Sequence, residues 1–187
     1  MIQIKYALLV LSLVPALLAA PHTGDPIVSA CVESETFVMG GVLLSGERAA
    51  SQIFESIGVK LRWSCQDTAR NTILIRLAAH APRHFRKGTL AYALPFAREG
   101  VRITAFYDRL EPILEEHRLF AGIIFGHVLA HEIGHVLERV DAHAAAGLMR
   151  ARWSERDFLS MKFNVFGFAA EDAQFIRESA ERDLPVE

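Results

Sequence analysis

The chain has 187 residues, of which 51% are hydrophobic and 22% are charged, so it is long and apolar enough for one globular domain and is not a disordered chain. A formal net charge of −2 and an isoelectric point near 6.4 provide no basic field for nucleic acid. No cluster of Lys and Arg with interleaved aromatic residues occurs either, so nucleic-acid binding is disfavoured.

The first twenty residues have the features of a secretory signal peptide: Lys5 precedes an apolar stretch over 7–20 that ends in small residues. We therefore predict a signal peptide at 1–20 and a secreted or periplasmic protein. The stretch is short for a membrane span and is interrupted by Pro15. Two anchored alternatives remain open. Pro21 obstructs cleavage after Ala20 and favours an uncleaved signal anchor, and the residues up to Cys31 resemble a lipoprotein box.

The two cysteines of the chain are Cys31 and Cys65. In an oxidising compartment such a pair is compatible with one disulfide, and the alternative is two unpaired thiols. Their spacing matches neither a zinc ribbon nor a redox CxxC motif, so they are not assigned to a metal.

Residues 21–35 contain two prolines, a glycine and no clear hydrophobic period, which predicts an extended linker. Residues 36–187 are expected to form a single domain. Its first part is predicted to contain a helix over 46–56 capped by Ser45, and strands over 59–63, 73–78, 89–94 and 101–107. An exposed edge strand is expected near 101–107, and the charged segment 80–88 is predicted to be a solvated loop.

A helical period begins at 110 and leads, after a predicted break over 118–122, into a strongly apolar helix. Ser154 and Asp157 predict a capped short helix through 161, and an amphipathic helix is expected over 170–182.

The apolar helix contains an HExxH motif formed by His131, Glu132 and His135. A helix rises about 1.5 Å and turns 100° per residue, so both imidazoles lie on one face about 6 Å apart along the axis and can bind one ion. Zinc suits imidazole ligands, and Glu132 is placed to take a proton from water rather than to bind the metal. His127 lies one turn earlier but is too far along the helix for the same ion, so we predict a packed or hydrogen-bonded core histidine.

The motif and the residues after it, His143 and then Gly147, Leu148 and Met149, resemble the metzincin zinc metallopeptidases, whose pattern is HExxHxxGxxH followed by a Met-turn. The match is partial, because Glu138 and Asp141 occupy the positions of the glycine and the third histidine. The stretch also resembles a group of largely uncharacterised secreted acidobacterial proteins of metzincin-like type. The resemblance places Met149 beneath the metal.

The third ligand is expected to be His143, if two residues are inserted in the turn, because three neutral imidazoles leave the zinc able to polarise water. Asp141 is the second choice. A distal glutamate, Glu171 or Glu178, would instead make the site thermolysin-like.

The resemblance implies an α+β fold: a metzincin-like zincin domain with a mixed, twisted sheet of about four to five strands, packed on a long N-terminal helix and the HExxH helix, with a small helical C-terminal part. We expect a monomeric zinc metalloendopeptidase that acts on a peptide or protein extended along the edge strand, with Glu132 as general base. The alternatives are a zinc-binding domain with little or no peptidase activity, suggested by Glu138 at the glycine position, and a structural domain without metal.

Overall fold

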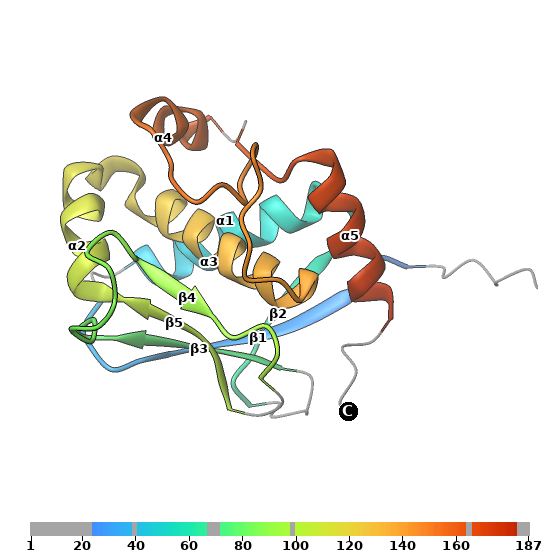
Figure 1. The fold of residues 1–187 in the computed structure, drawn as a ribbon, viewed down its shortest axis with the longest axis horizontal. Coiled ribbons are helices and arrows are strands. Elements are labelled where there is room, and N and C mark those ends of the chain that lie inside the picture. The colour runs from blue at the N-terminus through green and yellow to red at the C-terminus, as the bar shows by residue number, and fades with distance from the viewer. Residues whose placement is uncertain (1–23, 39–40, 67–71, 98–99, 164–165, 183–187) are drawn as a thin grey trace, which may run out of the picture.

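The computed structural model describes residues 24–38, 41–66, 72–97, 100–163 and 166–182, and the predicted signal peptide lies outside these residues. Within them the fold is α+β, as predicted, with one five-stranded sheet and helices packed against it (Figure 1). The strands are β1 (Ile27–Ser34), β2 (Lys60–Trp63), β3 (Ile73–Ala78), β4 (Ala91–Ala93) and β5 (Val101–Phe106). The helices are α1 (Val42–Glu55), α2 (Tyr107–Glu116), the 3₁₀ helix η1 (Arg118–Phe120), α3 (Ala121–Glu138), α4 (Glu155–Lys162) and α5 (Ala170–Glu181).

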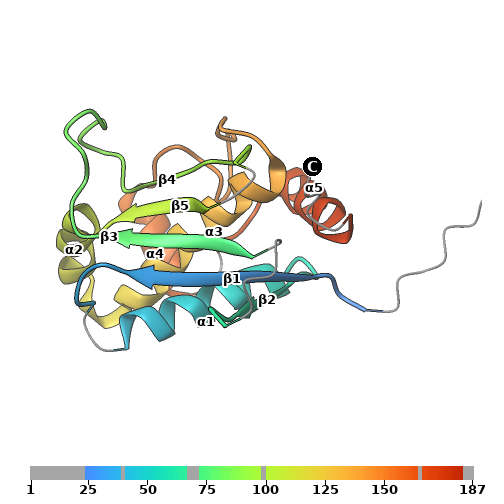
Figure 2. The ribbon, with the colours of Figure 1, turned by 90° about the horizontal axis from the view of Figure 1, so that it is seen from below.

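The sheet has the strand order β2-β1-β3-β5-β4, in which all neighbours are parallel except β4, which is antiparallel to β5. The views of Figures 1 and 2 place α1 and α3 on the same side of this sheet. Strand β3 shows the resulting pattern, because Ile73, Ile75 and Leu77 are buried while Arg76 points to solvent. One face of the sheet therefore carries the core.

Strand β1 corrects the linker predicted over 21–35. It lies inside the sheet between β2 and β3, and Val28, Ala30 and Cys31 are buried there. A strand with parallel neighbours on both sides and adjacent buried residues lacks a clean alternation of apolar and polar residues, so its pattern was not recognisable. The prediction of a linker is wrong for Ile27–Ser34, which belong to the centre of the fold.

The edge strand also differs from the prediction. Strand β5 was expected near an exposed edge, but it pairs with β3 on one side and β4 on the other. The chain between β4 and β5 folds back as an antiparallel connection, so the short strand β4 becomes the outermost strand. The exposed edge beside β5 is therefore Ala91–Ala93.

Helix α1 begins at Val42, earlier than the predicted start after Ser45, because Gly41 adopts the left-handed conformation (φ 88°) at the N-cap. Helix α1 also packs very close to α3. A Cβ on Gly126 would lie 2.6 Å from the carbonyl oxygen of Gly46, and a Cβ on Gly122 would lie 2.3 Å from the Cβ of Ser45. The two helices approach this closely only because these positions are glycine.

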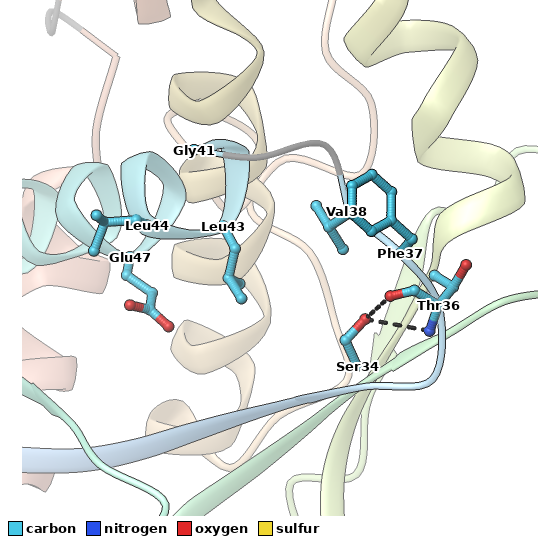
Figure 3. Close-up of a pocket in the computed structure, with 8 residues that line it drawn as sticks. All are labelled: Ser34, Thr36, Phe37, Val38, Gly41, Leu43, Leu44 and Glu47. Atoms are coloured by element: carbon cyan, nitrogen blue, oxygen red, sulfur yellow. Dashed lines mark hydrogen bonds between the residues drawn. The ribbon is translucent and has the colours of Figure 1, made fainter.

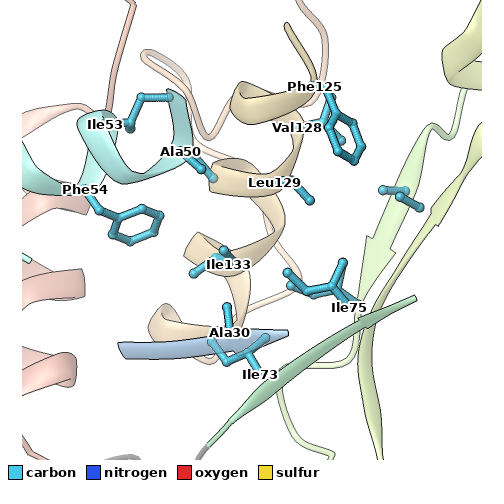
Figure 4. Close-up of a cluster of buried hydrophobic side chains, with 14 of the residues drawn as sticks. Ala30, Ala50, Ile53, Phe54, Ile73, Ile75, Phe125, Val128, Leu129 and Ile133 are labelled. Carbon is cyan, nitrogen blue, oxygen red and sulfur yellow. The ribbon is translucent and has the colours of Figure 1, made fainter. Parts of the chain in front are cut away.

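The core lies between α1, α3 and the sheet (Figure 4). Ala50 and Phe54 extend from α1, Leu129 and Ile133 from α3, and Ile75 from β3. These side chains are almost completely removed from water, which stabilises each of the Phe, Leu and Ile side chains by about 1.5–3 kcal/mol relative to an exposed side chain. The packing holds α3 against the sheet.

The helical stretch Arg118–Glu138, which comprises η1 and α3, is long and apolar enough to cross a membrane, but 78% of its apolar window is buried inside the fold, as expected for a core helix. The predicted break before it is confirmed by η1, and the predicted capping of α4 is confirmed because Asp157 accepts hydrogen bonds from the backbone and hydroxyl of Ser154.

Cys31 of β1 and Cys65, which follows β2, form a disulfide with a Cα–Cα distance of 4.8 Å. Of the two alternatives for the cysteines, the structure contains the bonded pair. The bond ties a central strand to the loop beyond its neighbour.

Candidate metal centre

Helix α3 places His131 and His135 one turn apart, and both side chains are buried. Their Nε2 atoms lie 3.1 Å from each other, with the two rings nearly perpendicular. Two nitrogen ligands at about 2.0–2.1 Å from a tetrahedral ion are separated by about 3.3 Å. The helix therefore brings the two nitrogens to the separation that one zinc-sized ion requires.

His143 completes a cluster of three histidines, whose ligand atoms all lie within 4.8 Å of one another. It lies in the exposed segment after α3, and its ring centroid is 5.3 Å from that of His131 and 4.9 Å from that of His135. Among the residues that the structure describes, neither Asp141 nor Glu171 nor Glu178 belongs to the cluster. The structure thus favours His143 over the three carboxylates considered as third ligand.

The turn that brings His143 back to the helix occurs at Arg139, which adopts the left-handed conformation with φ 54° and ψ 40°. Its backbone N–H donates to His135, and this residue ends α3. The metzincin pattern has its glycine one position earlier, where this chain has Glu138. The later turn is consistent with a third histidine that is also displaced along the sequence.

Hydrogen bonds to two backbone carbonyls fix the tautomers of the helix histidines. The Nδ1 of His131 lies 2.8 Å from the carbonyl oxygen of Leu148, and the Nδ1 of His135 lies 3.0 Å from that of Val140. A carbonyl oxygen only accepts, so each Nδ1 carries the proton and donates it. Each Nε2 is then an unprotonated lone pair, and the two lone pairs face each other.

The protonation of these rings is opposed by their surroundings. The pKa of His131 is lowered to about 4, chiefly by burial; the neighbouring His135 and His143 act in the same direction, and the hydrogen bond to Leu148 acts against them. Burial also lowers the pKa of His135, with His143 acting in the same direction. Near neutral pH the rings are therefore uncharged, which is the form that binds metal.

Glu132 is 7% exposed and lies between the two helix ligands in the sequence. Burial raises the pKa of its carboxyl group from 4.5 to about 8. A cation held by the neighbouring histidines would favour the carboxylate and lower this pKa again. The pKa of Glu132 therefore lies near neutral pH, in the range useful for general acid–base chemistry.

Met149 is buried beneath α3, against the glycine of the motif. A Cβ on Gly134 would lie 2.7 Å from the Met149 sulfur and 3.1 Å from a ring carbon of Phe168. The turn before it is closed by a hydrogen bond from the N–H of Ala144 to the carbonyl of Met149, and by Gly147 with φ 69°. Met149 therefore packs against the helix at Gly134, between the two helix histidines in the sequence.

His127 is not part of the cluster. It is 1% exposed, and its ring nitrogens lie 2.8 Å from the carbonyl oxygen of Ile123 and 3.0 Å from that of Phe166. The prediction of a hydrogen-bonded core histidine is confirmed. Tyr107, whose orientation the sequence left open, lines a small cavity with Phe37 and Glu111, and no histidine lines that cavity.

The sequence did not identify Trp153 or the carbonyls of Leu148 and Val140 as parts of the site. Trp153 lies edge-on to His131, with the ring centroids 5.6 Å apart. Backbone carbonyls that orient a ligand cannot be recognised in a sequence, because every residue has a carbonyl. In the sequence, Trp153 is distinguished only by its position shortly after Met149.

A surface cavity of about 490 Å³ lies elsewhere, between the end of β1 and the start of α1 (Figure 3). Its lining is mostly apolar, with Phe37 and Leu44 exposed, and Glu47 is the charged residue at its edge. None of the three histidines lines this cavity, so the cavity is separate from the candidate metal centre.

Comparison with known protein families finds no family that matches the chain, and no curated protein matches its sequence. The assignment of the site therefore depends on its own geometry: a mixed α+β domain with a five-stranded, mostly parallel sheet, and three histidines that could hold one metal ion.

Proposed function

We propose that the chain is a zinc-dependent metallopeptidase with a metzincin-like site. The observation that carries the proposal is the pair of unprotonated Nε2 atoms of His131 and His135, 3.1 Å apart, with His143 beside them. Two lone pairs at this distance repel each other unless a cation lies between them. A metal ion resolves that repulsion.

The donor set favours zinc among the common metals. Three neutral imidazoles suit zinc, whereas calcium and magnesium prefer oxygen ligands. Three protein ligands also leave one position of a tetrahedral ion for water or substrate, which is typical of catalytic zinc. When bound, zinc lowers the pKa of water and polarises a carbonyl group.

Glu132 would act as general base and then as general acid. Its carboxylate accepts a proton from the water that attacks the peptide carbonyl, and the carboxyl group then donates that proton to the leaving amine. Burial of this group supports the role, because it makes the carboxylate a stronger base than an exposed glutamate.

Strand β4 is the proposed docking edge for the substrate. It pairs with β5 along one side and is the terminal strand of the sheet, so its other side offers backbone groups to an extended peptide or protein segment. It also packs near α3, which carries the ligands. The substrate strand would thus lie against Ala91–Ala93 rather than against β5.

We further propose that the protein is exported and acts as a monomer. The Cys31–Cys65 disulfide supports an oxidising compartment, in agreement with the predicted signal peptide. The membrane would be involved only if the signal segment or a lipid anchor were retained.

Zinc content of the purified protein tests the metal site, compared between wild type, His143→Ala and Asp141→Ala. We expect about one zinc per chain in wild type and in Asp141→Ala, and loss of zinc in His143→Ala. Both positions are exposed and two residues apart, so the aspartate variant is a matched control. A zinc-free wild type after refolding with the metal would refute the proposal.

Hydrolysis is tested with Glu132→Gln, which replaces the carboxyl group with an amide of the same shape. We expect unchanged zinc content and a loss of peptidase activity on an unfolded protein substrate of about 100-fold or more. If wild type binds zinc and cleaves nothing, the alternative of a zinc-binding domain without peptidase activity would be favoured.

A further inference from the structure

Trp153 shares a hydrogen-bond acceptor with a candidate metal ligand. Its indole Nε1–H donates to the carbonyl oxygen of Leu148 at 3.2 Å, and the same oxygen accepts the Nδ1–H of His131 at 2.8 Å. A carbonyl oxygen has two lone pairs and can accept both bonds. The orientation of His131 therefore depends on an oxygen that Trp153 also holds.

The indole ring is itself fixed by packing on both sides. It meets His131 edge-on at 85°, with the centroids 5.6 Å apart. It also meets Phe158 of α4 and Phe166 in T-shaped contacts at 6.4 and 6.1 Å. Such edge-to-face contacts restrict the ring to one pose. The Trp153 ring thus packs between His131 and the C-terminal residues Phe158 and Phe166.

Further contacts fix the residues that pack against Trp153. Arg150 forms an ion pair with Asp157 in the first turn of α4, and its guanidinium lies 5.7 Å from the ring centroid of Phe166. The backbone N–H of Leu148 donates to the carbonyl of Gly167 at 2.8 Å. Leu148 is therefore held by two hydrogen bonds: its backbone N–H donates to Gly167, and its carbonyl oxygen accepts from Trp153.

We propose that Trp153 is a positioning residue for the metal site, which holds the Leu148 carbonyl where it orients His131. The inference rests on the proposed zinc site. Groups that orient a ligating histidine through its second nitrogen change metal affinity by about 10–100-fold when they are removed. Leu148 supplies a backbone atom, so the side chain of Trp153 is the part of this arrangement that a substitution can remove.

The test compares zinc affinity in wild type, Trp153→Phe and Trp63→Phe, measured on the full chain by competition with a chelator. Phenylalanine keeps an aromatic ring and removes the N–H donor. Trp63 is a matched control because it also makes one N–H bond, to the hydroxyl of Ser51 at 2.9 Å, and lies on β2 at the other edge of the sheet from β4. We expect zinc binding to weaken by about 10-fold or more in Trp153→Phe and to stay within about twofold in Trp63→Phe.

Thermal unfolding of the zinc-free proteins separates positioning from stability. Each variant loses one hydrogen bond, so we expect a similar small fall in the melting temperature of both. Equal zinc affinity in Trp153→Phe and wild type would overturn the inference, as would equal weakening in both variants. A wild type that binds no zinc would refute the proposed function and this inference with it.

Fluorescence gives a second measurement that does not depend on the folding of Trp153→Phe. The chain has two tryptophans, so Trp153 is the sole one in Trp63→Phe. Cobalt(II) placed in the histidine site should quench its emission stoichiometrically, because the indole contacts a ligand ring. Emission that is unchanged when cobalt binds would show that Trp153 is remote from the ion and would overturn the inference.

Discussion

Glu138 provides a test of the electrostatics behind the metal helix. Its side chain is 9% exposed at the end of α3, which packs against α5. Burial, and after it the carboxylate of Asp172, raises the pKa of Glu138 from 4.5 to about 7. One carboxylate oxygen of Asp172 is buried without a hydrogen-bond partner, and none of the ion pairs among the described residues includes either group. The two acids therefore repel each other once both are ionised.

The raised pKa sets the sign of the pH dependence. The folded state binds this proton more tightly than the unfolded state, so the stabilising effect of the proton is complete below pH 4.5 and is lost as the pH rises towards about 7. A pKa difference of about 2.5 corresponds to about 3 kcal/mol. Glu138→Gln removes the titration. It should match wild type near pH 4 and exceed its stability by up to about 3 kcal/mol near pH 8.

The assay is urea unfolding of the zinc-free protein at several pH values, followed by circular dichroism. Glu116→Gln, at an exposed position on α2, serves as control and should leave the profile unchanged. The reasoning would be refuted if the difference between Glu138→Gln and wild type were the same at pH 4 and pH 8.

Three further predictions concern backbone and packing. Arg139→Gly should raise stability by about 1 kcal/mol in chemical denaturation, because glycine adopts the left-handed conformation without the cost of a side chain, and an unchanged midpoint would contradict this. Gly134→Ala should lower the melting temperature and weaken zinc binding, because its methyl group must displace Met149, and overpacking costs about 1–3 kcal/mol. Reduction of the Cys31–Cys65 bond, which closes a loop with a sequence separation of 34, should cost about 4 kcal/mol in the loop-entropy estimate, and equal midpoints with and without reductant would contradict it.

The candidate site was largely predictable because its main parts are side chains in a fixed pattern. A helical spacing of four residues is enough to bring His131 and His135 together, and the structure adds His143 to them. The atoms that orient these rings were not predictable. The carbonyls of Leu148 and Val140 act through backbone oxygens, whose positions depend on how the chain turns after the helix.

The strands were predicted where they alternate or form compact apolar runs, and missed where they do not. Strand β3 has three buried residues at alternate positions and was found with the observed bounds. Strand β1 pairs with a parallel strand on both sides, lacks a clean alternation of buried and exposed residues, and was taken for a linker. The position of β4 outside β5 depends on the pairing of segments in space, which the local pattern of Ala91–Ala93 does not contain.

The three histidines differ in how they are supported, and this has a consequence for how an ion would enter and leave. His131 and His135 stand on a helix locked against α1 through glycine contacts, whereas His143 belongs to an exposed segment beyond the turn at Arg139. We expect His131 and His135 to hold two ligand positions in place before an ion arrives, and His143 to bind the ion last. The lifetime of the bound ion would then be governed by the loop, and loop substitutions should alter dissociation rates far more than capture rates.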